Sequence, residues 1–333
     1  MSTSPVRAVM LAWRLGRPTL LGVTAATACL GLIAAPGSKI DVHLPAFAVA
    51  VLLYHYAGVV INDVMDVDVD AMAPRRGRSP LVTGEVPVAA GLRIGAACLI
   101  GALLVAMTWL RTDPGAVLVF TGSIVCMLAY NLVGKRVPVP LLMDLVQGLA
   151  WGLLVLWAGR ATRETNVVAA AIVLYMTQVN AVHGGVRDAA IDRRAGRFTT
   201  ALLLGVAERA GGGLQVPRSL RFVAYSLQAI LLILAGAWVV SSPPDTTSGM
   251  LAAVGTLGIL ITGFGMLRRG LRPEIAVPDR EIAGARHIAL TFQAIAYLSA
   301  VNGGRRDLLL AQGLGALLVA PLLAHTSFRS RSR

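Results

Sequence analysis

The strongest constraint on the fold of this chain is a series of apolar runs, each long enough to cross a lipid bilayer. A helix needs about 20 consecutive apolar residues to span the hydrocarbon core. Hydrophobic residues make up 56% of the 333-residue chain and charged residues only 14%, which excludes an ordinary soluble domain. The candidate runs cover residues 18–36, 45–63, 88–110, 115–132, 139–159, 166–185, 219–241, 248–268, 285–302 and 307–325. The sequence therefore predicts an all-α, polytopic membrane helix bundle with nine or ten transmembrane helices.

The net charge of +13 follows a pattern typical of membrane topology rather than of nucleic-acid binding. Basic residues gather in alternate connections between the runs, as they do in cytoplasmic loops. They are Arg75, Arg76, Arg78, Lys135, Arg136, Arg187, Arg193, Arg194, Arg197, Arg209, Arg218, Arg221, Arg268, Arg269 and Arg272. We expect one integral-membrane domain over residues 1–333, with a short basic N-terminal segment 1–17 on the cytoplasmic side and a C-terminal tail 326–333.

Acidic residues gather in two clusters, at the ends of the second and sixth runs. Both ends lie on the side that the basic residues mark as cytoplasmic. The first cluster, NDVMDVDVD, contains Asn62, Asp63, Asp66, Asp68 and Asp70. The second, within GGVRDAAIDRRAGRFTT, contains Asp188 and Asp192. The charge pattern therefore brings both clusters to one face of the membrane.

The spacing within each cluster predicts that most of its carboxylates share a helical face. If the first helix continues through its cluster at about 100° per residue, its Asn and Asp side chains fall within one arc, except Asp68, which points away and is expected to be solvated. Asp188 and Asp192 are four residues apart and also share a face. Like charges so arranged repel, so we expect a cation between the clusters. Oxygen ligands of this kind suit Mg²⁺, which takes a few carboxylates together with substrate phosphates.

The surroundings of these clusters indicate the kind of ligand that the cation would carry. Nearby arginine and lysine side chains suit phosphate oxygens. The site opens at the membrane boundary beneath apolar helices, so its anionic ligand should bear a long hydrocarbon tail. A polyprenyl diphosphate has that shape.

The two clusters and their flanks resemble the motifs of the UbiA superfamily of intramembrane prenyltransferases. NDVMDVDVD is similar to the N-D-x-x-D-x-x-x-D signature of that family, and DAAID, followed by Gly196 and Thr199, resembles its second acidic motif. The segments RSPLVTG and YNLVGKR extend the resemblance, which covers the chain from about residue 15 to 325.

The resemblance implies Mg²⁺-dependent transfer of a prenyl group from an isoprenoid diphosphate to a lipophilic, aromatic acceptor within the membrane. It also implies roles for single residues, in which preplaced cations stabilise the charge of the leaving group. The implied metal ligands are Asp63, Asp66, Asp70, Asp188 and Asp192, with Asp66, Asp192 and Asn62 essential for catalysis. The implied diphosphate contacts are Lys135, Arg136 and Arg78, and Tyr130 matches an aromatic residue of the family.

The chain departs from the family pattern at three points. Gly185 stands where the second motif often has a further acid, and Ser79 separates Arg78 from Pro80 where the family often reads Arg-Pro. Family members usually have nine spanning helices, and run 285–302 contains polar residues and could be interfacial or re-entrant.

Two other functions stay open at the level of sequence. A terpene cyclase of the same superfamily would ionise the diphosphate without an acceptor. A membrane transporter is less consistent with the sequence, because transporters tend to hold charge near the bilayer midplane between inverted repeats. We expect membrane lipids as surroundings, no nucleic acid and no obligatory protein partner, and a bacterial cytoplasmic membrane with the active site facing the cytoplasm.

His55 and Tyr130 each allow two interpretations. His55 lies seven residues before Asn62, about 20° from it on the helical wheel and roughly 10 Å deeper in the membrane. It is either a neutral histidine satisfied by a neighbouring helix or a residue of the cavity where prenyl chain and acceptor meet. Tyr130, close to Lys135, is likewise either structural or substrate-binding.

Overall fold

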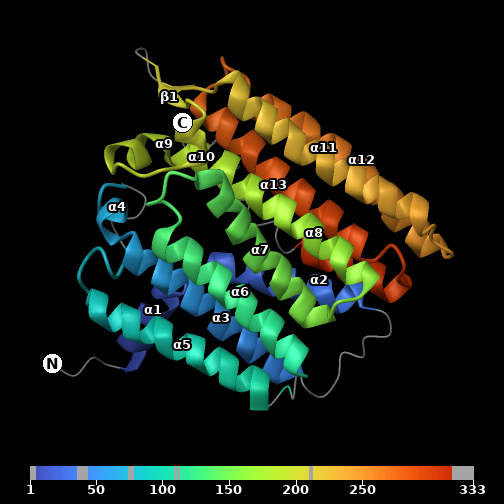
Figure 1. The fold of residues 1–333 in the computed structure, drawn as a ribbon, viewed down its shortest axis with the longest axis horizontal. Coiled ribbons are helices and arrows are strands. Elements are labelled where there is room, and N and C mark those ends of the chain that lie inside the picture. Colours follow the sequence, from blue (N-terminus) through green and yellow to red (C-terminus); the bar gives the residue numbers. More distant parts are fainter. Residues whose placement is uncertain are drawn as a thin grey trace.

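The computed structural model describes residues 5–35, 44–73, 79–108, 110, 113–209 and 213–316. These residues form a bundle of long helices, so the predicted all-α fold is confirmed (Figure 1). A two-residue antiparallel pair, β1 (Ala207–Glu208) with β2 (Leu214–Gln215), is the only sheet in the described part. The helices are α1 (Pro5–Leu15), α2 (Pro18–Ala34), α3 (Leu44–Met65), α4 (Val67–Ala71), α5 (Val88–Thr108), α6 (Pro114–Val133), α7 (Pro140–Gly159), α8 (Arg163–Gln178), the π-helix η1 (Val179–Gly184), α9 (Gly185–Arg194), α10 (Thr200–Leu203), α11 (Arg218–Ser241), α12 (Thr247–Gly270) and α13 (Val277–Ser299).

Seven helices of the described part are long and apolar enough to cross a membrane. They are α3, α5, α6, α7, α11, α12 and the continuous span of 32 residues made by α8, η1 and α9. The pair α1–α2 would add an eighth if it is one span bent by 64°. The predicted number of nine or ten is therefore not confirmed.

The last two predicted runs differ from the others. Run 285–302 lies largely in α13, an unbroken helix that packs along α12 and has most of its residues from His287 onward buried. Its charged first turns, with Asp279, Arg280, Glu281 and Arg286, keep α13 out of the set of clearly apolar spans. Residues 305–316 are helical, whereas 317–325 lie outside the described residues.

Two of the four apolar clusters in the described part join most of the long helices. One joins α3, α5, α6 and α7 around Phe120, and the other joins α8, α11, α12 and α13 around Phe292. Helices α2 and α7 pack together between them, and glycines permit a close approach: a Cβ on Gly31 would lie 2.2 Å from the Val155 carbonyl oxygen. Small residues at crossings let helix backbones come close where hydrocarbon solvent provides no hydrophobic drive.

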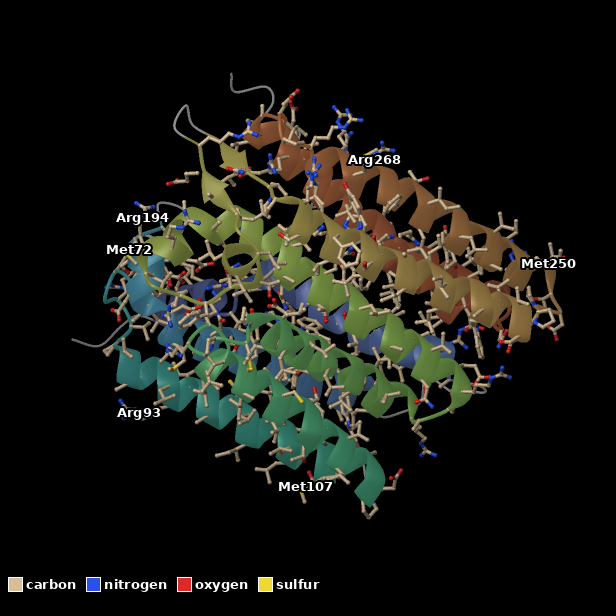
Figure 2. All side chains as sticks on the ribbon, turned by 45° about the horizontal axis from the view of Figure 1, so that its top comes forward. Met72, Arg93, Met107, Arg194, Met250 and Arg268 are labelled. Atoms are coloured by element: carbon tan, nitrogen blue, oxygen red, sulfur yellow. The ribbon has the colours of Figure 1, made fainter. Side chains whose placement is uncertain are left out.

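Both acidic motifs lie at the same end of the bundle. Figure 1 shows α4, which carries the end of the first motif, beside α9, which carries the second. In Figure 2 the labelled Met72 and Arg194 lie together at this end, while Met107 and Met250 lie at the opposite one. The predicted convergence of the two motifs is thus observed, although helices α3 and α9 belong to different halves of the chain.

Candidate active site

The first acidic motif is not one continuous helix, and this corrects the expectation from sequence. Helix α3 ends at Met65, Asp66 has a non-helical backbone (φ −109°, ψ 11°), and α4 begins at Val67. Hydrogen bonds from Asp66 N to Asn62 O and from Asp70 N to Asp66 O span the break. Asp and the β-branched Val are both poor helix formers, so their alternation favours a break here.

The predicted separation of exposed and inward-facing carboxylates survives the break. Asp63 and Asp66 are buried, with 4% and 8% exposure. Asn62 and Asp70 are partly buried, and Asp68 is exposed, as predicted. The motif therefore directs four of its five polar side chains toward the protein.

Arg17 compensates two of these carboxylates. Its Nε donates to Asp63 Oδ2 at 2.9 Å and its Nη2 donates to Asp63 Oδ1, while Nη2 lies 3.5 Å from Asp70 Oδ2. Arg17 lies between α1 and α2 in the left-handed region, at φ 43° and ψ 67°. Such a backbone costs about 1–3 kcal/mol in a non-glycine residue and persists only where surrounding contacts enforce it. The ion pairs with the acidic motif are contacts of this kind.

Asp66 is held by two other cations, from separate segments of the chain. Lys135 Nζ lies 3.1 Å from Asp66 Oδ2, and Arg197 Nη2 lies 3.4 Å from Asp66 Oδ1. Arg136, predicted from the sequence as a diphosphate contact, instead donates to the carbonyl oxygens of Met65 and Leu132. The side chains that gather around this point are Asn62, Asp66, Tyr130, Asn131, Lys135 and Arg136.

The second acidic motif follows an irregular stretch of helix. The π-helical η1 ends at Gly184, and α9 carries both Asp188 and Asp192 on regular helix, as expected. Asp192 is 3% exposed, whereas Asp188 is partly exposed and accepts two hydrogen bonds from Arg187, at 2.8 and 2.6 Å. Single π-turns occur often at functional sites.

The two motifs form one electrostatic unit. Asp192 lies within electrostatic range of Lys135, Asp188, Asp66 and Arg197. One carboxylate from each motif, Asp192 and Asp66, therefore lies near the same pair of cations. This is the arrangement that the alternating charge pattern predicted, and the individual roles of these residues stay predictions.

The donor set suits Mg²⁺ in chemistry and charge. All five predicted ligands are carboxylates, and hard cations take oxygen ligands. Within the described ranges, no three acidic, histidine or cysteine side chains converge closely enough to hold a metal ion. Arg17, Lys135 and Arg197 lie against Asp63, Asp70 and Asp66 instead. The carboxylates thus require positive charge, which in this arrangement comes from side chains.

His55 has partners for both ring nitrogens. Nε2 lies 2.7 Å from the Gly16 carbonyl oxygen and Nδ1 lies 2.9 Å from the Thr24 hydroxyl, and the side chain is buried. These contacts match the interpretation of a histidine satisfied by a neighbouring helix, and they connect α3 to the bend before α2. A role of His55 in substrate binding stays a prediction. Arg78 lies outside the described residues.

Three residues of the site were missed or not singled out in the sequence. The sequence places Arg17 only in the short basic N-terminal segment and Arg197 among arginines that are mostly topology signals, although both contact the first motif. Asp144, on α7, is 7% exposed and accepts a hydrogen bond of 2.6 Å from Thr200 Oγ1. A signal for Asp144 was present, because an ionisable residue inside an apolar run is by default a candidate functional residue.

Helix α1 lies beside this site and is tied to the loop after the first motif. Arg14 donates two hydrogen bonds to Glu85, at 3.0 and 2.9 Å. These bonds, with a further one from Thr83, lower the pKa of the exposed Glu85 carboxyl. Exposed pairs of this kind contribute little stability, so Arg17 rather than Arg14 provides the stronger attachment of this segment.

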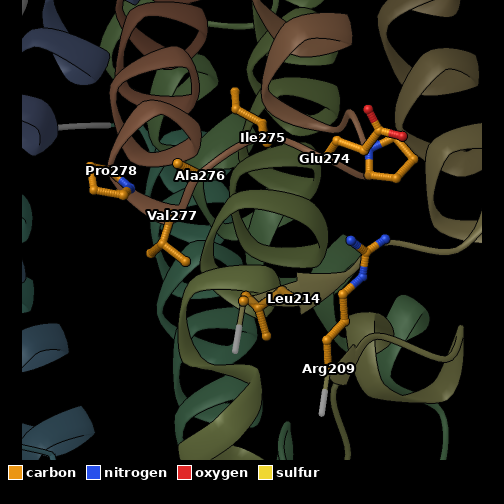
Figure 3. A pocket seen from close by; sticks show the side chains of 9 residues that line it. Arg209, Leu214, Glu274, Ile275, Ala276, Val277 and Pro278 are labelled. Atoms are coloured by element: carbon orange, nitrogen blue, oxygen red, sulfur yellow. The ribbon is translucent and has the colours of Figure 1, made fainter. Parts of the chain in front are cut away.

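A separate hollow shares no residue with either acidic motif. It has a volume of about 410 Å³ and lies between the β-hairpin and the connection from α12 to α13 (Figure 3). Its charged side chains are Arg209 and Glu274. The candidate active site is therefore defined by the convergence of polar side chains and not by the size of a hollow.

Comparison with known proteins identifies the class to which this fold and site belong. Residues 24–276 match the model of the UbiA prenyltransferase family. The match covers more than half of the chain, and the protein belongs to this family.

The chain is also similar to individual family members. It is 30% identical over 214 residues to the 4-hydroxybenzoate octaprenyltransferase of Azotobacter vinelandii, and the match spans 62% of this chain and 65% of that relative. A UbiA homologue from Archaeoglobus fulgidus, solved bound to GPP and Mg²⁺, has a TM-score of 0.64 at 20% identity, covering 88% of this chain and 99% of that one. A second homologue, from Aeropyrum pernix, gives 0.62 at 19% identity, covering 84% and 95%. The structural likeness shows a shared fold.

Proposed function

We propose that this protein transfers a prenyl group from an isoprenoid diphosphate to a lipophilic, aromatic acceptor within the membrane, with Mg²⁺ as cofactor. The observation that carries this proposal is the convergence of two acidic motifs on Lys135 and Arg197 at one end of a membrane bundle. A similar relative acts as a 4-hydroxybenzoate octaprenyltransferase, and a homologue of the same fold binds GPP and Mg²⁺. We further propose that this end faces the cytoplasm of a bacterial cell.

The carboxylates and cations of the site would divide the work of binding. Asp63, Asp66, Asp70, Asp188 and Asp192 would hold Mg²⁺, which neutralises charge on the diphosphate when bound. Lys135, Arg197 and Arg17 already lie against these carboxylates, so the same side chains would move to diphosphate oxygens when a metal takes over the acids. Arg136 and Arg78 would add further contacts, and Asn62 and Tyr130 would line the entrance.

The reaction needs charge stabilisation at one place and an apolar environment at another. The bond between prenyl C1 and the diphosphate oxygen breaks, and its electron pair stays on the diphosphate, where preplaced cations stabilise it. A new bond forms between C1 and a carbon of the acceptor, which then loses a proton to restore its aromatic ring. The apolar helices that continue from the site would surround the prenyl tail.

The test is prenyl transfer by the purified protein in lipid nanodiscs. Radiolabelled prenyl diphosphate and MgCl₂ are supplied with and without 4-hydroxybenzoate or a membrane extract as acceptor. We expect diphosphate release that depends on both Mg²⁺ and acceptor, with the label recovered in a prenylated aromatic product. Release without acceptor would favour the cyclase alternative, and absence of release together with uptake of label into vesicles would favour transport.

A further inference from the structure

The segment after the second acidic motif connects three parts of the site. This segment, residues 195–200, is called the strap here. It turns away from α9 at Gly196, which has φ +63°, and Arg197 N donates to Asp192 O at 2.8 Å. The strap therefore begins on the carbonyl of a predicted metal ligand.

The strap next contacts the first motif and its cationic partner. Arg197 places Nη2 3.4 Å from Asp66 Oδ1. The following residue, Phe198, donates its backbone N–H to Lys135 O at 3.0 Å. This backbone hydrogen bond fixes the position of Arg197 relative to Lys135, the other cation on Asp66. If the strap shifted and this bond broke, Arg197 would move relative to Lys135.

The far end of the strap is fastened to a membrane helix. Thr200 is 1% exposed, and its hydroxyl donates to Asp144 Oδ2 at 2.6 Å. Asp144 has no ion-pair partner among the described residues, since the nearby Lys135 acts on it only through its charge. Both partners of this bond are buried, so breaking it would leave polar groups without a hydrogen-bond partner, which is costly. This bond is well suited to anchor the strap.

We propose that Asp144 is a positioning residue: through Thr200 it holds the strap in register, so that Arg197 is kept beside Asp66 for binding of the prenyl diphosphate. This inference rests on the proposed function and assigns a role to an acid outside both motifs. Asp144 acts through other side chains and makes no contact with the reacting atoms. Loss of the Asp144 carboxylate should therefore raise the Kd of the prenyl diphosphate more than it lowers the kcat of the enzyme–substrate complex.

The test is a double-mutant cycle in nanodiscs, read out as the Kd of radiolabelled GPP with MgCl₂. We expect Asp144→Ala and Thr200→Val each to raise the Kd by about tenfold, a size consistent with loss of one buried hydrogen bond. Thr200→Ser keeps the hydroxyl and should restore binding. Added to Arg197→Gln, Asp144→Ala should cause no further loss, because residues that act through one another are not additive.

Thr256→Val provides the matched control. Thr256 is as buried as Thr200, but its hydroxyl bonds to the carbonyls of Ala252 and Ala294 between α12 and α13. Unchanged GPP binding in this variant and a raised Kd in Thr200→Val would support the proposal. Full additivity of Asp144→Ala with Arg197→Gln, or an unchanged Kd in Thr200→Val, would overturn it.

These outcomes are separable from failure of the proposed function. GPP binding needs neither acceptor nor turnover, so the cycle can be completed even if no acceptor is prenylated. Conversely, the wild type could transfer the prenyl group to an acceptor while the Thr200→Val variant binds GPP with an unchanged Kd. That result would contradict the proposed role of the strap and would support the transferase function.

Discussion

Two aspartates only two positions apart in the first motif have opposite environments. Asp66 is buried against Lys135 and Arg197, whereas Asp68 is exposed. The helical wheel predicted this difference although the helix breaks at Asp66, because the break is short and backbone hydrogen bonds cross it. At the scale of single residues, helical periodicity thus identified the inward-facing acids correctly, although it assumed a continuous helix where the structure has a break.

The difference between these aspartates predicts a difference in activity. We expect Asp66→Asn to lower kcat/KM for the prenyl diphosphate by at least about a hundredfold, since electrostatic groups at a reacting centre contribute several kcal/mol. Asp68→Asn should remain within about threefold of wild type, because exposed charges interact weakly. Steady-state kinetics of the two variants in parallel provides the measurement. Equal loss in both would contradict the assignment of Asp68 to solvent.

The cationic partners of the first acidic motif could not be predicted from the sequence, because they are distant from it along the chain. Arg17 is 46 positions from Asp63, and Arg197 is 131 positions from Asp66. Each arginine stands among others that are only topology signals, and nothing in the local pattern separates the two kinds. Asp144 differs, because a carboxylate within an apolar run is unusual in itself.

Among the structural elements, the apolar runs were predicted well and their interruptions were not. Run 45–63 became α3 (Leu44–Met65), and run 115–132 became α6 (Pro114–Val133). The bend between α1 and α2 is held by ion pairs from Arg17 to the first acidic motif, and the break before α4 is favoured by the alternation of Asp and Val. Hydrophobicity alone carries no signal for either feature or for the π-helix η1, so these three irregularities appear only in the structure.

The bend between α1 and α2 leads to a prediction about stability. Arg17→Gln removes the cation from the buried Asp63 and leaves its carboxylate unpaired, which is costly. We expect the apparent Tm in detergent to fall by about 3 °C or more, given the usual relation between stability and Tm. Added MgCl₂ should recover more of the loss in this variant than it adds to wild type, because a divalent ion can replace the missing charge.

The control for this prediction is Arg14→Gln, since Arg14 pairs with the exposed Glu85 on the same segment. Its Tm should change by less than about 1 °C. A Tm for Arg17→Gln that matches Arg14→Gln, with no extra response to MgCl₂, would show that Arg17 does not balance the acidic motif. Thermal unfolding followed by intrinsic fluorescence is sufficient for all three proteins.

At the scale of the whole molecule, the surface is the reverse of a soluble protein. Large apolar side chains are widely exposed along the long helices, including Leu118, Phe222, Val240 and Val254. A soluble monomer rarely exposes so much contiguous apolar surface, and lipid is its natural solvent here. Composition alone was enough to predict this apolar surface. The number of membrane spans could not be predicted in the same way, because it depends on which helices carry charged turns.

The alternation of charge predicts opposite sides of the membrane for the two ends of the bundle. With the three native cysteines replaced by alanine, a cysteine at Thr83 should react with a membrane-impermeant maleimide only from the cytoplasmic side. A cysteine at Ser248 should react only from outside, because Ser248 is two residues before Met250, which Figure 2 shows at the end opposite the acidic motifs. Labelling of Thr83→Cys in intact cells, without permeabilisation, would exclude a site that faces the cytoplasm.

The span formed by α8, η1 and α9 is longer than a bilayer requires. Its 32 residues extend over about 48 Å at 1.5 Å per residue, against about 30 Å of hydrocarbon. The surplus, roughly its last dozen residues, includes Asp188 and Asp192. With the charged first turn of α8, Arg163 and Glu164, at the opposite interface, we expect these acids at the depth of the lipid headgroups. A lipid-borne diphosphate can arrive at this level by lateral diffusion within its own leaflet, without drawing its tail through an aqueous phase.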